Sequence, residues 1–285
     1  MNLDYIEKCA KAYEGKLNEE EQGRLDYFVG LWKVMNECIE SRSETKAYQL
    51  PSLAEVRELY MSGTPIFSQA LPNVNAEQYA EASRAIADYI LENGEYTEDV
   101  ANAVRSVDWL DLVIKQNSDH MQLDMNDLGT RIAGLVLVLA QFTFYEPITE
   151  QIMEAIRGDR MTDAHPIACP VCGSGAAISI IDRNENFSGT GRELYCGRCG
   201  MSWEFDRIRC ARCGCTDEDA MQFVNIGNAK NHQIQLCDNC GEFIRTTFVD
   251  PNLPEVAPIV EDIVSTPIEE IVRAGALENL EDAQE

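Results

Sequence analysis

The sequence predicts an α+β protein in which an all-α N-terminal domain precedes two tandem cysteine-rich modules and a C-terminal helical tail. Three observations lead to this prediction. The front of the chain shows helical periodicity and almost no strand pattern, eight of the eleven cysteines form C-x-x-C pairs behind it, and an acidic segment containing several prolines follows. We therefore expect a helical domain at residues 1–160, modules at 165–205 and 206–250, and an acidic, partly helical tail at 251–285.

The first strongly patterned segment is an amphipathic helix. Asn18 precedes three glutamates, which is typical of an N-cap with acidic residues in the first turn. Apolar residues then recur on one face from Leu25 to Ile39. Similar patterns predict further helices after Pro51, over residues 79–90 with an end at Asn93-Gly94, and from Thr97 onward.

The segment from Leu128 to Tyr145 is apolar almost all round, so we expect it to be the central helix, buried by the others. Pro147 should end or kink it. Its longest apolar run is far shorter than the roughly 20 residues that a membrane span needs. The first residues lack the basic and apolar stretches of an export signal, so we expect a cytoplasmic protein without membrane insertion.

The net charge of the 285-residue chain is −26, and the cysteine-rich segment is its least acidic part. Such a charge repels nucleic acid and anionic membranes at long range. Cysteines in a reducing compartment are more often metal ligands or catalytic thiols than disulfide partners. The sequence contains no recognisable nucleophile motif or phosphate-binding loop, so we predict no catalytic residues.

The cysteine pairs form an internal repeat. The unit C-x2-C-x23-C-x2-C occurs twice, and each cysteine of the first copy recurs 41 residues later. Two residues between cysteines allow one turn to direct both sulfurs at one ion, and two such turns complete a tetrahedral S4 shell for zinc or rubredoxin-type iron. The predicted metal ligands are Cys169, Cys172, Cys196, Cys199, Cys210, Cys213, Cys237 and Cys240.

Two groupings of these cysteines are compatible with the spacing. The repeat favours sequential sites, Cys169 to Cys199 and Cys210 to Cys240, whereas interleaved, cross-braced sites are the alternative. Three cysteines lie outside the repeat. Cys9 and Cys38 are interpreted as buried apolar residues, and Cys215 as a bystander, with a spare ligand or a reactive thiol as its alternatives. Because each site already has four cysteines, none of the three histidines, His120, His165 and His232, is needed as a ligand.

The 23 residues between the pairs suit β-hairpins. Strands are expected at residues 177–181 and 193–195 in the first module and at 221–224 and 233–236 in the second. We expect the metal sites to hold both hairpins rigid and to present their tips, residues 184–190 and 225–231, to solvent. In the tail, apolar residues between Pro258 and Val272 should dock a broken amphipathic helix onto the body.

The sequence around the cysteines resembles the FdhE-type formate dehydrogenase accessory proteins. The resemblance lies in Cys169-Pro170-Val171-Cys172-Gly173-Ser174, Gly191 to Cys196, Trp203, Arg207-Ile208-Arg209-Cys210, and Cys237-Asp238-Asn239-Cys240-Gly241 with Phe243-Ile244. It covers residues 165–250, and a short loop, Ser62-Gly63-Thr64-Pro65, is also similar.

This resemblance implies tandem rubredoxin-like or zinc-ribbon modules and two metal ions, zinc or iron, bound by the eight cysteines. It also implies a non-catalytic cytoplasmic maturation chaperone that acts on the molybdenum- or tungsten-containing catalytic subunit of formate dehydrogenase.

Two other functions share these features. One is a rubredoxin-like electron-transfer protein, and the other is a nucleic-acid-binding zinc ribbon. The latter would use an arginine and aromatic patch formed by Arg183, Arg192, Arg198, Arg207, Arg209, Arg212, Tyr195 and Trp203.

Overall fold

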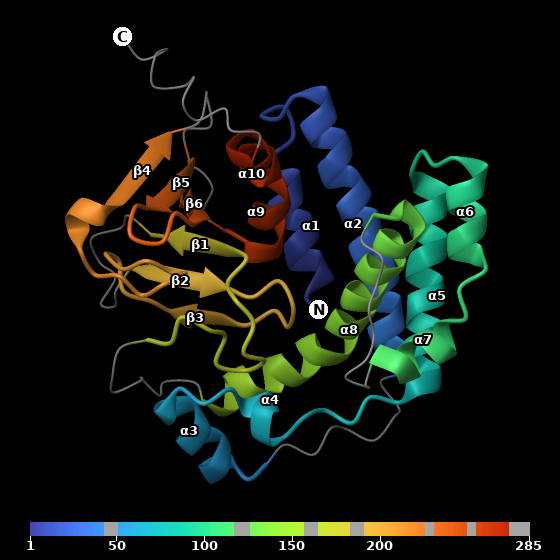
Figure 1. Cartoon of the computed structure of the whole chain (residues 1–285), viewed down its shortest axis with the longest axis horizontal. Helices are drawn as coiled ribbons and strands as arrows, with labels where there is room; N and C mark the ends of the chain where they lie inside the picture. Colours follow the sequence, from blue (N-terminus) through green and yellow to red (C-terminus); the bar gives the residue numbers. More distant parts are fainter. Residues whose placement is uncertain are drawn as a thin grey trace.

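The structure is a computed structural model, and it combines a helical body with one six-stranded sheet (Figure 1). The residues it describes are 1–42, 51–116, 126–156, 165–182, 191–225, 231–249 and 255–273. The sheet occupies one side of the molecule and the larger helices the other, with the C-terminal helices between them (Figure 1). The predicted α+β class is confirmed.

The helical body is built around one long central helix. Its helices are α1 (Leu3–Lys11), α2 (Glu19–Glu40), α5 (Ala76–Asn93), α6 (Glu98–Arg105), α7 (Trp109–Gln116) and α8 (Leu128–Ala155). Two short helices, α3 (Leu53–Ser62) and α4 (Ile66–Gln69), lie at the base of the molecule, near the C-terminal end of α8 (Figure 1). The core residues of α8, such as Val136 and Ala140, have no exposed surface, so α8 is the predicted central helix.

The helix starts read from the sequence are confirmed by their caps. The side chain of Asn18 accepts the Glu21 backbone N–H at 2.9 Å, and the Glu21 carboxylate accepts the Asn18 N–H at 3.0 Å. This reciprocal capping box satisfies two backbone donors at the start of α2. Thr97 caps α6 with a single bond, in which its side chain accepts the Val100 N–H.

Pro147 does not end α8, which continues to Ala155. Proline lacks the N–H that would bond to the carbonyl of Thr143, four residues earlier. The guanidinium of Arg42 replaces this donor, with Nη2 3.0 Å from the Thr143 carbonyl oxygen and 2.8 Å from Thr143 Oγ1. The same guanidinium stacks 3.8 Å above the ring of Phe144. A side chain from outside the helix thus supports the backbone where the proline weakens it.

In length and composition, α8 also meets the requirements of a membrane span. The core helix of a soluble protein meets them too, and 61% of the most apolar window of α8 is buried inside the molecule. The burial agrees with the expectation of a core helix.

The sheet contains strands from both cysteine modules. Its strands are β1 (Ile178–Ile181), β2 (Arg192–Tyr195), β3 (Ser202–Glu204), β4 (Met221–Asn225), β5 (His232–Cys237) and β6 (Phe243–Phe248), in the spatial order β3-β2-β1-β6-β5-β4. Both predicted hairpins are present, β1 with β2 and β4 with β5. The predicted hairpin tips lie outside the described residues, except for Asn225 and Asn231.

The sequence repeat corresponds to a repeated three-stranded unit. Each module contributes an antiparallel hairpin followed by a third strand, so β3-β2-β1 and β6-β5-β4 are equivalent. The two units join where β1 pairs in parallel with β6, with Ile178 opposite Arg245 and Ile181 opposite Phe248. The tandem modules therefore form one continuous sheet, a joint that the sequence did not predict.

The tail docks onto the body through a buried polar cluster. Helices α9 (Pro258–Val264) and α10 (Thr266–Arg273) form the predicted broken helix. Glu261, only 2% exposed, accepts a hydrogen bond from the Tyr13 hydroxyl at 2.7 Å and lies 2.8 Å from His232 Nε2. One tail carboxylate thus connects the helical body to strand β5.

Candidate metal centres

The four C-x-x-C segments adopt the same turn. In each, the first cysteine donates its N–H to the carbonyl of the residue five positions later, and the glycine after the pair donates back to the first cysteine. In the first turn, these are Cys169 N to the Ser174 carbonyl and Gly173 N to the Cys169 carbonyl, both 2.8 Å. The four glycines have φ between +68° and +79°, a conformation that L side chains rarely adopt. Their occurrence after every pair is therefore explained by the turn itself.

The turns bring the eight cysteines together in two groups. One contains Cys169, Cys172, Cys196 and Cys199, and the other Cys210, Cys213, Cys237 and Cys240; within each, all Sγ atoms lie within 4.8 Å of one another. This is the sequential grouping. The Sγ–Sγ distance is 3.5 Å for Cys169–Cys199 and Cys172–Cys196 in the first group, and 3.8 Å for Cys210–Cys240 and Cys213–Cys237 in the second.

These distances fit a metal-centred tetrahedron. Metal–sulfur bonds of about 2.3 Å place the corners of a tetrahedral S4 shell roughly 3.8 Å apart. Four thiolates suit zinc or iron equally well by ligand type. The two tetracysteine groups can therefore bind two metal ions, one each.

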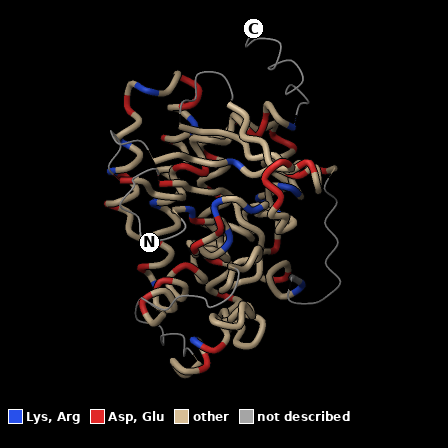
Figure 2. The backbone as a smooth tube through the Cα atoms, turned by 90° about the vertical axis from the view of Figure 1, so that its left-hand side faces the viewer, with Lys and Arg blue, Asp and Glu red and all other residues tan. Residues whose placement is uncertain are grey.

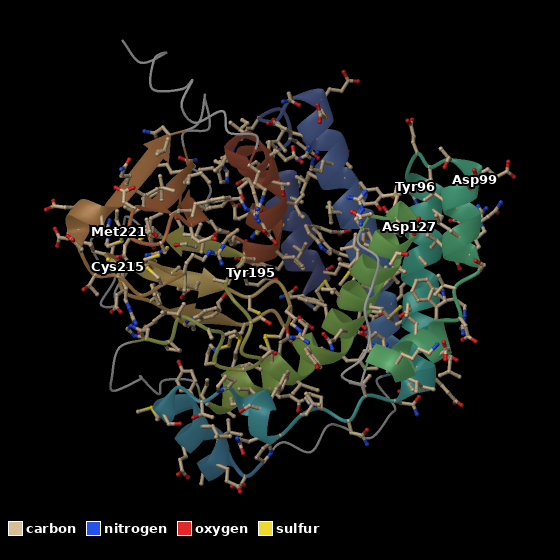
Figure 3. The ribbon with its side chains drawn as sticks, viewed as in Figure 1. Tyr96, Asp99, Asp127, Tyr195, Cys215 and Met221 are labelled. Carbon is tan, nitrogen blue, oxygen red and sulfur yellow. The ribbon has the colours of Figure 1, made fainter. Side chains whose placement is uncertain are left out.

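The other candidate ligands remain outside these groups. Among the described residues, Cys215 belongs to neither, and its backbone carbonyl instead accepts the Cys210 N–H at 2.8 Å. His165 Nδ1 lies 3.3 Å from Asp206, and His232 pairs with Glu261. His120 falls outside the described residues. Figure 3 shows Cys215 and Met221 at the end of the sheet, far from Tyr195.

The first group is enclosed by apolar side chains. Cys169, Cys196 and Cys199 are fully buried within a cluster that includes Phe67 and Tyr145. The segment after the Ser62–Pro65 loop fastens this site, because Ile66 and Phe67 donate their N–H groups to the carbonyls of Pro170 and Val171 at 3.0 and 2.8 Å. The loop belongs to the sequence resemblance, but this contact was not predictable because it joins residues distant along the chain.

The second group reaches the surface. Cys210 and Cys237 are buried, Cys240 is partly exposed and Cys213 is exposed. Hydrogen bonds from the Cys215 backbone and the Asn239 amide lower the pKa of Cys213 to about 6. The Asn239 nitrogen lies 3.6 Å from Cys213 Sγ. In the metal-free protein, this thiol is therefore mostly ionised at neutral pH.

Arginines of the predicted surface patch instead connect the two modules. Arg192 is 1% exposed; its guanidinium donates to Ser179 Oγ at 2.8 Å, to Gln235 Oε1 at 2.6 Å and to the Arg209 carbonyl at 2.8 Å. Burial lowers its pKa to about 10, so it remains protonated at neutral pH. Arg212 donates to the carbonyls of Ala176 and Phe243, one in each module.

The aromatic members of that patch are also internal. Trp203 is 3% exposed and Tyr195 is 5% exposed. Arg198 and Arg207 are exposed, and Arg183 lies outside the described residues. Acidic and basic positions are interspersed on the side of the molecule that carries the sheet (Figure 2). The predicted arginine and aromatic patch is therefore not a continuous surface in the described part of the chain.

Comparisons with known proteins agree on one family. The protein FdhE homolog of Aquifex aeolicus is 31% identical over 102 residues, which are 35% of this chain and 35% of that protein. The protein FdhE homolog of Rhizobium meliloti is 23% identical over 116 residues, 40% of this chain and 37% of that protein. The chain thus matches about a third of the length of these curated relatives. No family model matches it.

The fold agrees with these matches. The crystal structure of the FdhE protein from Pseudomonas aeruginosa aligns with a TM-score of 0.56 over 96% of this chain and 92% of that one, at 14% identity. The sequence is thus similar to FdhE homologues over part of its length, and the fold is similar to that of an FdhE protein. The two tetracysteine groups are the functional feature that the sequence and structure of this chain make most evident.

Proposed function

We propose that this protein is a non-catalytic maturation factor for formate dehydrogenase that acts in the cytoplasm on the molybdenum- or tungsten-containing catalytic subunit. The observation that carries the proposal is the match to FdhE proteins in a chain that gathers eight cysteines into two groups of four. The sequence match covers about a third of each relative. The identity of the partner protein and its molybdenum or tungsten cofactor therefore belong to this proposal.

In this function the metal ions have a structural role, and each would cross-link four thiolates. The chain's own residues do the remaining work. The glycine turns direct the sulfurs inward, Arg192 holds the two modules in one sheet, and α9 fixes that sheet against the helical body. The result is a rigid surface. At its second module, Ile208 and Phe223 are 49% and 44% exposed, and we expect them to contact the partner.

Electron transfer is a second candidate because the second tetracysteine group reaches solvent. An iron in this shell would lie near the surface through Cys213 and Cys240, as electron exchange requires. This function uses the same ligands as the maturation factor. The two are separated by the identity of the metal and of the bound partner.

Affinity capture from the native host tests the proposal. The tagged protein is isolated from anaerobic lysate, and its partners are identified by mass spectrometry. We expect the formate dehydrogenase catalytic subunit with the unmodified protein and its loss with Cys172→Ser. Cys38→Ser is the matched control, since it removes a half-buried thiol outside both groups and should retain the partner. Recovery of a small redox protein instead would favour electron transfer and contradict the maturation proposal.

A further inference from the structure

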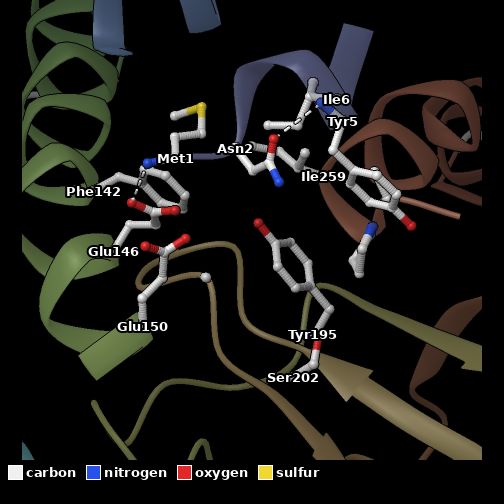
Figure 4. Close-up of a pocket in the computed structure, with 13 residues that line it drawn as sticks. Met1, Asn2, Tyr5, Ile6, Phe142, Glu146, Glu150, Tyr195, Ser202 and Ile259 are labelled. Atoms are coloured by element: carbon white, nitrogen blue, oxygen red, sulfur yellow. Dashed lines mark hydrogen bonds and ion pairs between the residues drawn. The ribbon is translucent and has the colours of Figure 1, made fainter. Parts of the chain in front are cut away.

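A cavity of about 180 Å³ lies beside the first tetracysteine group, among helices α1, α8 and α9 and strands β2 and β3 (Figure 4). Its wall next to the cysteines contains Gly200, which follows Cys199 directly, and Tyr195, which precedes Cys196. The apolar part of the lining includes Ile6, Phe142 and Ile259. The cavity is smaller than the roughly 300–1,000 Å³ of small-molecule pockets, and its size suits a single side chain.

The hydroxyl of Tyr195 points into this cavity (Figure 4). The residue is 5% exposed, and within the described part of the chain its hydroxyl has no hydrogen-bond partner. Other buried tyrosines are satisfied: the Tyr79 hydroxyl donates to the Leu137 carbonyl and the Tyr13 hydroxyl to the Glu261 carboxylate, both at 2.7 Å. Because a polar group among apolar walls is stabilised by a hydrogen-bond partner, the Tyr195 hydroxyl offers a position for a ligand atom or a water.

The charges around the cavity specify the sign of that ligand. Glu146 and Glu150 extend from α8 into the cavity (Figure 4). The Met1 nitrogen lies 3.0 Å from Glu146 Oε2, so the lining contains two carboxylates, Glu146 and Glu150, and one cation. Four thiolates around one metal ion would add net negative charge nearby. The site therefore attracts a cation.

We propose that this cavity binds one cationic side chain, a lysine or an arginine, of a protein partner. The Tyr195 hydroxyl oxygen accepts an N–H from the head group, Glu150 provides the countercharge, and Phe142 and Ile259 contact the aliphatic stem. This proposal depends on the proposed function in one respect, which is that the cationic side chain belongs to a protein partner. It places a contact for the partner directly beside the buried metal centre.

The test uses free amino-acid probes on the full-length, zinc-loaded protein. The probes are N-acetyl-arginine N-methylamide, N-acetyl-lysine N-methylamide and, as a neutral match for arginine, N-acetyl-citrulline N-methylamide. Backbone amide NMR signals of Gly200 and Ser202, which line the cavity, report binding. We expect these signals to shift with either cationic probe and not with citrulline. Equal shifts with citrulline, or no shift with any probe, would overturn the proposal.

Two variants locate the binding site. Tyr195→Phe and Glu150→Gln should each weaken binding of the cationic probe by about tenfold, which is the effect of losing one good polar contact. Glu154→Gln is the matched control, since Glu154 is exposed one turn further along α8 and does not line the cavity. Unchanged affinity in Glu150→Gln contradicts the assignment even if Tyr195→Phe proves unstable. Failure of the probes with formate dehydrogenase still captured would overturn this proposal alone.

Discussion

The two tetracysteine groups have the same sequence spacing and the same turns but different surroundings. The first is enclosed in an apolar cluster with residues of α4 and α8, whereas the second extends to solvent at Cys213. Next to the second module, the apolar cluster of the described residues has two buried members, Ile234 and Ile268, with partly buried apolar side chains around them. The repeat therefore determines how each group can hold a metal, and the packing around it determines how much of the fold depends on that metal.

The largest expected difference is between equivalent cysteines of the two groups, Cys169 and Cys210. Cys169→Ser should remove the first metal and unfold the sheet together with its contacts to α4, because structural zinc contributes roughly 10–16 kcal/mol in small zinc domains. Cys210→Ser should remove one metal and leave the first module folded. Metal content per chain and thermal unfolding measure both effects. Equal loss of stability in the two variants would show that the difference in burial has no energetic consequence.

A smaller effect is expected at the joint between the modules. Arg192→Met removes the donor shared by Ser179, Gln235 and the Arg209 carbonyl, and it leaves these buried acceptors unsatisfied. We expect a loss of about 3 kcal/mol or more in the free energy of unfolding, measured by denaturant titration. Arg207→Met, at an exposed arginine nearby, is the control and should change stability by less than about 0.5 kcal/mol. A similar loss in both variants would exclude a special role of Arg192.

The smallest effect concerns thiol reactivity in the metal-free protein. Because the pKa of Cys213 is lowered to about 6, its thiolate predominates at pH 7 and disappears as the pH falls below 6. Burial raises the pKa of Cys38, so this thiol ionises only at alkaline pH. Iodoacetamide should therefore label Cys213 faster than Cys38 at pH 7, as followed by peptide mass spectrometry. Labelling of Cys38 at an equal rate would contradict the lowered pKa, and rebinding of zinc should protect Cys213.

Local features of this fold were predictable from the sequence because they depend on neighbouring residues. The N-caps at Asn18 and Thr97 and the glycine after each cysteine pair follow from backbone requirements within a few residues. The same holds for the two hairpins. Their strands are short and alternate with turn residues, so the pattern indicates both the strands and their pairing.

Features that join distant segments were not predictable. The parallel pairing of β1 with β6, the contact of Ile66 with Pro170 and the burial of Arg192 each depend on which segments meet in space. A charged residue such as Arg192 is normally assigned to the surface, and only its shared acceptors explain its burial. The continuation of α8 past Pro147 likewise depends on Arg42, which lies just after the C-terminal end of α2.

The parallel pairing of β1 with β6 also imposes an order on biosynthesis. Strand β1 can pair with β2 as soon as the first module has left the ribosome, but its other edge stays open until Phe248 has been translated. During that interval the nascent chain has an unpaired strand edge beside the first cysteine pair, Cys169 and Cys172. Early metal capture by the first module would hold the hairpin in register while the ribosome completes the strand that closes it.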